Sequence, residues 1–190
     1  SWPGAGAEGT LKPDNLCYNV AITAATNSDV EEGLELAKIM FNRLSDPGNN
    51  DKLVRDVVSY NAMLKVLTKF GYFEEAIDLF YKMKKTSIRP DKYTYTALAK
   101  AVIVDDDDVE ELLYDMRDQG VQADVMTFNT IVRYLCEQKK LSAARKVINF
   151  MEASGIPPDS WTYGFLMKGL LERCTIFTNI HHRRPPLKRS

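Results

Sequence analysis

Cysteine and histidine are scarce in this sequence of 190 residues, and the few present are poorly placed for chemistry. Cys17, Cys136 and Cys174 form neither a CxxC pair nor a disulfide framework, which favours reduced thiols. His181 and His182 are adjacent in a polar tail, so a four-ligand zinc site and a histidine-based triad both lack partners. The glycine-rich phosphate-binding patterns GxxxxGKS/T and GxGxxG are also missing. We therefore expect no enzyme, no metal and no cofactor.

Long apolar runs and an excess of charge of one sign are absent as well. A membrane-spanning helix needs ~18 apolar residues in succession, and the runs here extend over only a few residues. The 25 Lys and Arg nearly balance the 26 Asp and Glu, for a net charge of −1, which argues against a polybasic DNA-binding protein. Neither a membrane nor DNA is an expected partner.

The main feature that the sequence does contain is an internal repeat. Aromatic residues recur at intervals of 42, 35, 33 and 35 residues, at Tyr18, Tyr60, Tyr95, Phe128 and Tyr163. Aspartates recur at the same irregular intervals, at Asp14, Asp56, Asp91, Asp124 and Asp159. Two unrelated residue types that keep the same spacing indicate a repeated structural unit.

Each repeat has the pattern of two amphipathic helices. In the second repeat, an apolar stripe at i, i+3, i+4 and i+7 is formed by Tyr60, Met63, Leu64 and Leu67. Ser59 is the expected N-cap of this helix, and Gly71 the expected break after it. A second stripe is formed by Ala76, Leu79, Phe80 and Met83. The fourth repeat follows the same plan with Phe128, Ile131, Val132 and Leu135, then Ala144, Val147, Ile148 and Met151.

One helical hairpin cannot bury its own apolar stripe, but stacked hairpins can, so we expect an all-α superhelix, a solenoid of helix-turn-helix repeats. The expected organisation is a lead-in over 1–14, repeat 1 with a loop insertion over 15–56, repeats 2 to 4 over 57–91, 92–124 and 125–159, a partial repeat 5 over 160–174, and a disordered basic tail over 175–190. The partial repeat is expected to be one helix that ends near Glu172. The acidic run Asp105–Asp108 is expected to be a solvated turn that holds Mg²⁺ weakly at most.

The unit resembles the pentatricopeptide repeat. The matching segments are Val58-Ser59-Tyr60-Asn61, Glu74-Glu75-Ala76 and Ile88-Arg89-Pro90-Asp91, then Met126-Thr127-Phe128-Asn129 and Ile156-Pro157-Pro158-Asp159. The resemblance covers the chain from Pro13 to about Glu172. The rival is the tetratricopeptide repeat, whose W-x2-L-G-x2-Y pattern no unit here supplies.

The resemblance implies binding of single-stranded RNA with one base per repeat. The fifth and last residues of a repeat would recognise the base together, in the pairs Asn19 with Asp56, Asn61 with Asp91, Thr96 with Asp124, and Asn129 with Asp159. The second residue of each repeat would pack against the base faces: Leu16, Val58, Tyr93, Met126 and Trp161. By the family's pairing preference an Asn–Asp pair implies uracil, less often cytosine, and a Thr–Asp pair implies guanine. The implied core sequence is UUGU, read in chain order from 5′ to 3′. Gly164 has no side chain, so repeat 5 would recognise no base.

The same residue types also have simple structural roles. An Asp before a helix favours the positive N-terminal end whatever the helix binds. The aromatic residue before each Asn is expected in the core, and an Asn in a first turn can serve local hydrogen bonds alone. Weak phosphate contacts are expected from Lys65, Lys69, Lys100 and Arg133.

The leading hypothesis is sequence-selective RNA binding in organellar RNA processing, stability, editing or translation, in the mitochondrion or the chloroplast. Residues 1–12 show no targeting pattern, so a targeting segment would lie upstream. The alternative is a protein–protein interaction scaffold of the tetratricopeptide-like type on the same concave surface, and a protein partner is also compatible with RNA binding. An enzyme fragment is disfavoured because the HxE and CxxC motifs of a zinc deaminase are absent.

Overall fold

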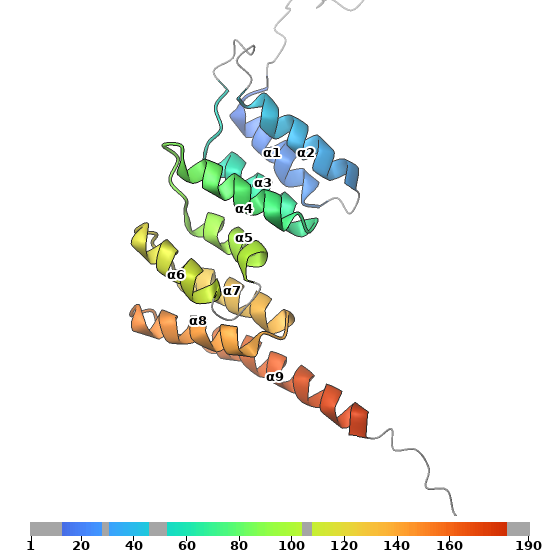
Figure 1. The fold of residues 1–190 in the computed structure, drawn as a ribbon, viewed down its shortest axis with the longest axis vertical. Coiled ribbons are helices and arrows are strands. Elements are labelled where there is room, and N and C mark those ends of the chain that lie inside the picture. The colour runs from blue at the N-terminus through green and yellow to red at the C-terminus, as the bar shows by residue number, and fades with distance from the viewer. Residues whose placement is uncertain (1–12, 28–30, 46–52, 104–107, 182–190) are drawn as a thin grey trace, which may run out of the picture.

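The computed structural model describes residues 13–27, 31–45, 53–103 and 108–181, with side chains up to residue 172. All regular structure in these ranges is helical. The helices are α1 (Asn15–Ala25), α2 (Glu31–Arg43), α3 (Val57–Lys69), α4 (Phe73–Lys84), α5 (Lys92–Val102), α6 (Asp108–Asp118), α7 (Val125–Glu137), α8 (Leu141–Ala153) and α9 (Ser160–His181) (Figure 1). The predicted all-α fold is confirmed for the described part of the chain.

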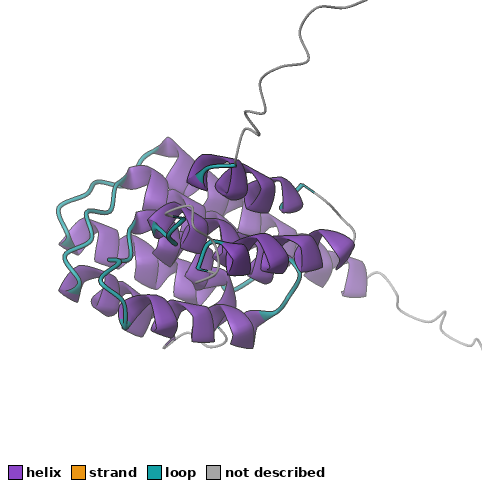
Figure 2. Ribbon diagram, turned by 90° about the horizontal axis from the view of Figure 1, so that it is seen from above, coloured by secondary structure: helices purple, strands orange, loops and turns teal. Residues whose placement is uncertain are grey.

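The helices pair into hairpins that stack in chain order, from α1 and α2 at one end to α8 and α9 at the other (Figure 1). The odd-numbered helices α1, α3, α5, α7 and α9 contact one another in sequence and form a first layer, and α6 contacts α8 in the second layer. Viewed along the stack, the helices run beside one another with the connecting loops at their ends (Figure 2). The predicted superhelical solenoid is confirmed, and residues at equivalent positions of the first layer fall into rows.

The apolar stripes form one continuous core between the two layers. The predicted stripe of α3 is at most 4% exposed, and the stripes of α4, α7 and α8 are buried in the same way. Edge-to-face aromatic contacts join successive hairpins, with ring centroids 5.3 Å apart for Phe41 and Tyr60 and 5.7 Å apart for Phe80 and Tyr95. The aromatic residue before each fifth position is core in α1, α3, α5 and α7, as expected, whereas Tyr163 of α9 is exposed.

An aspartate caps the N-terminus of each first-layer helix. Each carboxylate accepts the backbone N–H of the third helical residue at 2.8 to 2.9 Å, in the order Asp14, Asp56, Asp91, Asp124 and Asp159. The prediction that Ser59 is an N-cap was wrong, because α3 already begins at Val57. Ser59 is instead the third residue of a capping box, and its Oγ accepts the N–H of Asp56 at 2.9 Å.

In the two hairpins whose turn is fully described, the turn between the helices contains one residue with positive φ. Gly71 follows α3 with a φ of 80°, and the next N–H donates to the Leu67 carbonyl at 2.9 Å, which confirms Gly71 as the predicted break. In the equivalent turn after α7, Lys139 takes a φ of 61°, and the next N–H donates to the Leu135 carbonyl at 2.9 Å. A side chain in this left-handed region costs about 1 kcal/mol that glycine avoids.

The last helix is longer than predicted. α9 continues to His181, past the expected end near Glu172 and the expected repeat boundary at 174, because neither glycine nor proline occurs between Glu172 and Pro185. The predicted tail was therefore wrong for residues 175–181, while 182–190 lie outside the described residues. So do the loop insertion at 46–52 and Asp105–Asp107 of the acidic run. No helix in the described ranges is long and apolar enough to span a bilayer.

Candidate nucleic-acid interface

The stacking brings the fifth residue of a repeat next to the last residue of the same repeat. The fifth residue lies near the start of a first-layer helix, and the last residue caps the next first-layer helix. Because successive first-layer helices pack side by side, the two residues meet although about thirty residues separate them in sequence. Each predicted pair therefore spans the boundary between two stacked repeats.

Three of the four predicted pairs are joined by hydrogen bonds from the Asn amide to the Asp carboxylate. The Nδ2–Oδ1 distance is 2.9 Å for Asn61 and Asp91, 3.0 Å for Asn129 and Asp159, and 3.3 Å for Asn19 and Asp56. The three amides are only 5 to 8% exposed, whereas the carboxylates are half-buried. A ligand above the pairs would meet a carboxylate and the edge of an amide that is already held in place.

A threonine of the next repeat fixes the amide in repeats 2 and 4. The Thr94 hydroxyl donates to Oδ1 of Asn61 at 2.6 Å, and the Thr162 hydroxyl donates to Oδ1 of Asn129 at 2.6 Å. Both threonines are fully buried. Because the amide oxygen accepts from threonine and the amide nitrogen donates to aspartate, flipping either amide would break both bonds. The sequence pattern did not single out these threonines, although serine or threonine recurs as the third residue of repeats 2 to 5.

Repeat 1 lacks this anchor. The Ser59 hydroxyl donates to the backbone carbonyl of Asp56 at 2.8 Å, and Oδ1 of Asn19 is buried without a hydrogen-bond partner among the described residues. Serine has no γ-methyl group to restrict its χ1 rotamer, so its hydroxyl can turn to another acceptor. The first pair is therefore the least constrained of the three.

The fourth predicted pair, in repeat 3, is not joined. The Thr96 hydroxyl donates to the Lys92 carbonyl at 2.6 Å, and the Asp124 carboxylate is bound by the Lys92 ammonium at Oδ2 and by the Thr127 hydroxyl and N–H at Oδ1. The Lys92 ammonium and the Thr127 groups lower the pKa of Asp124 to about 2. The threonine side chain is too short to bridge to the carboxylate, and a cation takes its place. Lys92 was not among the predicted site residues.

The second carboxylate oxygen distinguishes the repeats further. The capping and amide bonds to Asp91 and Asp159 all use Oδ1, and Oδ2 of each accepts no hydrogen bond from the described residues. The N–H of Thr162 and then the Asn129 amide lower the pKa of Asp159, which keeps that carboxyl ionised at neutral pH. Repeats 2 and 4 thus offer an open anionic acceptor where repeat 3 offers an ion pair.

The second residue of every repeat is apolar and exposed. The exposed fractions are 67% for Leu16, 53% for Val58, 55% for Tyr93, 72% for Met126 and 70% for Trp161. Large apolar side chains at one repeated position outside the core indicate a binding surface more strongly than scattered exposed residues do. Their row follows the row of pairs, because the second and fifth residues belong to the same helical turns.

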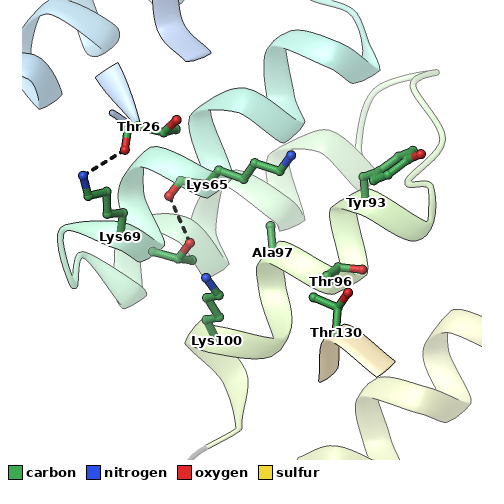
Figure 3. Close-up of a pocket in the computed structure, with 9 residues that line it drawn as sticks. Thr26, Lys65, Lys69, Tyr93, Thr96, Ala97, Lys100 and Thr130 are labelled. Carbon is green, nitrogen blue, oxygen red and sulfur yellow. Dashed lines mark hydrogen bonds between the residues drawn. The ribbon is translucent and has the colours of Figure 1, made fainter. Parts of the chain in front are cut away.

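Basic side chains line a hollow of about 440 Å³ beside the third pair (Figure 3). Its walls include Lys65, Lys69 and Lys100 together with Tyr93 and Thr96, so three of the four predicted phosphate contacts lie together. The Lys65 ammonium extends toward the Tyr93 ring, 5.9 Å from its centroid, and the Lys69 ammonium donates to the Thr26 carbonyl at 2.8 Å. The fourth, Arg133, lines a separate hollow with Lys168, which occupies the equivalent position of the fifth repeat.

Within the described ranges, no three His, Cys, Asp or Glu side chains lie close enough together to hold a metal ion. The described cysteines are unpaired, with Cys17 exposed and Cys136 buried. Burial raises the pKa of Cys136 to about 11, which keeps that thiol protonated and unreactive at neutral pH.

Comparison with known proteins identifies the repeat. The family model of the PPR repeat family matches residues 55–103 and 123–172, which together make up just over half of the chain. The chain belongs to this family. PPR denotes the pentatricopeptide repeat, so the resemblance inferred from the repeated Tyr-Asn and Pro-Asp markers is confirmed.

Several PPR proteins of Arabidopsis thaliana are similar in sequence. One is 32% identical over 113 residues, which are 57% of this chain and 20% of that protein. A second, named chloroplastic, is 26% identical over 137 residues, or 65% of this chain and 27% of that protein. A third, named mitochondrial, is 28% identical over 182 residues, or 86% of this chain and 45% of that protein. The chain thus spans from a fifth to just under half of the length of these relatives.

Solved PPR structures share the fold. The PPR10 protein of maize matches with a TM-score of 0.63 and 26% identity, over 93% of this chain and 26% of that one. PPR10 in complex with an 18-nucleotide psaJ RNA element matches with a TM-score of 0.65 and 24% identity, with the same coverage. The PPR domain of a protein-only RNase P from Arabidopsis thaliana, in complex with tRNA, matches with a TM-score of 0.59 and 17% identity, over 94% of this chain and 92% of that chain.

Proposed function

We propose that this PPR chain binds single-stranded RNA along the row of fifth and last residues, one base at each of repeats 1 to 4, without catalysing a reaction. The similar PPR10 protein was solved with an RNA element, which supports the choice of ligand. The observation that carries the proposal is the row of fixed polar groups flanked by exposed apolar side chains. An unpaired base in single-stranded RNA complements both features of this surface, since the edge of the base is polar and its faces are apolar.

An Asn–Asp pair complements uracil. The Asn61 amide has a second N–H to donate to a keto oxygen, and Oδ2 of Asp91 is open to accept the N3–H beside it. Cytosine carries a lone pair at N3, which the carboxylate would repel. The same argument applies to Asn129 with Asp159. In repeat 1 the Asn19 amide nitrogen lies 3.3 Å from Oδ1 and 3.4 Å from Oδ2 of Asp56, so this pair has the same groups under weaker restraint and without an open carboxylate oxygen.

The shorter Thr96 leaves room for a purine at repeat 3, and the four positions together give the core preference UUGU. Bases would lie between successive second residues, so the third base sits between Tyr93 and Met126. Aromatic contacts of this kind contribute roughly 1–3 kcal/mol per base. Lys65, Lys69 and Lys100 line the hollow beside this base and would face its phosphates.

The test is fluorescence anisotropy with a labelled RNA that contains UUGU and a scrambled RNA of the same composition. We expect clearly tighter binding of UUGU, and we expect Asn61→Asp, which replaces the amide donor by a second carboxylate, to weaken selection at the second base alone. Gly164→Ala serves as the matched control, because the added methyl group meets no atom within 4 Å. Equal, weak binding of both RNAs would exclude base recognition and favour a protein-binding scaffold.

We further propose a role in organellar RNA processing, stability, editing or translation. The names of two similar relatives, one chloroplastic and one mitochondrial, support an organellar location. A fluorescent fusion of the full-length protein should co-localise with an organelle marker. Fluorescence confined to the cytosol would contradict this proposal and leave the RNA-binding proposal standing.

A further inference from the structure

The first residue of repeat 3 is unlike its counterparts. The first residues of the five repeats are Asn15, Val57, Lys92, Val125 and Ser160. Lys92 is the one cation among them, and it is half-buried at the start of α5. Its ammonium binds Oδ2 of Asp124, the oxygen that is left open in Asp91 and Asp159.

This cation changes the chemistry offered to a base. In repeats 2 and 4 the donor beside the carboxylate is a neutral amide that belongs to the fifth residue. In repeat 3 the fifth residue, Thr96, points its hydroxyl back to the Lys92 carbonyl and supplies no donor to Asp124. The donor beside the carboxylate is therefore the ammonium of the first residue. An ammonium has three N–H groups, and the bond to Asp124 uses one of them.

We propose that Lys92 determines the choice of guanine over adenine at repeat 3, where the short Thr96 leaves room for a purine, by donating a hydrogen bond to the O6 keto oxygen of guanine while Asp124 accepts the neighbouring N1–H. This inference rests on the proposed RNA binding at the Thr96 position. Guanine presents an acceptor and a donor side by side on its Watson–Crick edge, in the order that an ammonium and a carboxylate complement. Adenine presents the reverse order, with an amino group at C6 and a lone pair at N1, so both contacts would become repulsive.

The surroundings of Lys92 fit this role. Its ammonium lies 5.4 Å from the centroid of the exposed Tyr93 ring, which is one of the two side chains that would hold the third base. The bond to Asp124 raises the pKa of Lys92, so the ammonium is retained at neutral pH. A lysine that only screened the carboxylate, or only attracted phosphate, would not distinguish one base from another.

The experiment compares Lys92→Val with the unchanged chain. Valine is the residue found at this position in repeats 2 and 4, so the helix start is preserved. Each protein is titrated with four RNAs that differ only at the third base: guanine, adenine, uracil, and 6-thioguanine, in which sulfur replaces O6 and N1–H is kept. The unchanged chain should bind 6-thioguanine about tenfold more weakly than guanine, the effect expected of one charge-assisted hydrogen bond. Lys92→Val should bind the two equally and lose most of its preference for guanine over adenine.

Two controls separate this inference from the proposed function. Val57→Lys adds the same charge at the equivalent position of repeat 2 and should leave the response to 6-thioguanine unchanged, and thermal melting checks that both variants fold. If Lys92→Val weakens all four RNAs by the same factor, Lys92 acts on phosphate and the inference is overturned. It is also overturned if the sulfur effect persists in Lys92→Val. Failure of the unchanged chain to select UUGU would instead refute the proposed function, and this inference with it.

Discussion

Replacing Thr94 by valine keeps the shape of a fully buried side chain and removes the hydroxyl that anchors Asn61. That hydroxyl donates to Oδ1 of Asn61 at 2.6 Å and accepts the N–H of Asp91 at 3.0 Å. Two hydrogen bonds at about 1 kcal/mol each give an expected loss of about 2 kcal/mol in the free energy of unfolding. At ~2–4 °C per kcal/mol for a chain of this size, the melting temperature should fall by about 4–8 °C.

Thermal and urea unfolding followed by circular dichroism measure this loss, and Thr127→Val is the matched control. Thr127 also belongs to a capping box, but its hydroxyl donates to Asp124 at 2.7 Å and contacts no asparagine. The Thr127 hydroxyl also accepts the N–H of Asp124, at a longer 3.4 Å, and its replacement leaves no amide oxygen without a donor, so we expect a smaller loss than for Thr94→Val. If Thr94→Val is no more destabilising than Thr127→Val, the threonine does not anchor the amide. In RNA titrations, Thr94→Val should reduce the discrimination between uracil and cytosine at the second base, whereas Thr127→Val should leave it unchanged.

Three further predictions concern the turns, the basic hollow and the capping carboxylates. Lys139→Gly should raise the unfolding free energy by about 1 kcal/mol and Gly71→Ala should lower it by a similar amount, because both positions have positive φ. Urea denaturation measures both changes, and a loss of stability in Lys139→Gly would contradict the backbone argument. Lys65→Ala and Lys100→Ala should weaken UUGU and scrambled RNA alike, each reducing the salt dependence of log K by about 0.7, and a base-dependent loss in anisotropy titrations would refute a phosphate role. The pKa of Asp124 is about 2 in the folded chain against an ordinary 3.8, so its contribution to stability is present above pH 4 and is lost as the pH falls toward 2. When the unfolding free energy is measured by urea titration between pH 4 and pH 2, it should fall less in Asp124→Asn than in the unchanged chain. An identical fall in both proteins would show that the ion pair does not stabilise the fold.

The periodic features of this chain could be predicted from sequence because periodicity reports burial directly. Tyr60, Met63, Leu64 and Leu67 recur on one helical face, and a helix in a stack must bury that face. The pairing of Asn61 with Asp91 was predicted from the resemblance to the pentatricopeptide repeat, in which the fifth and last residues of a repeat act together. Whatever occurs once per repeat lies in one row of a regular stack.

Features that occur once in the chain, or that depend on side-chain reach, were not predictable in this way. Whether Asp124 binds Thr96 or Lys92 depends on the lengths of the two side chains, and the repeat pattern is the same in either case. Ser59 was misplaced because serine and aspartate are both good N-caps, and the first residue of the helix decides between them. The end of α9 was missed because loss of the repeat pattern was taken for loss of helix, whereas residues 173–181 contain no proline or glycine that would end the helix before His181.

Each closing aspartate belongs to two repeats at once. Asp91 completes the pair of repeat 2, yet its carboxylate also caps the first helix of repeat 3. A repeat moved to another position would therefore carry its own pair and the cap of the following helix, but its own first helix would be capped by the aspartate of whichever repeat then precedes it. Transplanting a base preference without changing these caps requires cutting within helices and leaving the joints intact. Recoding is constrained as well, because a substitute at this position has to recognise a base and start a helix. That confines it to short polar side chains that accept hydrogen bonds.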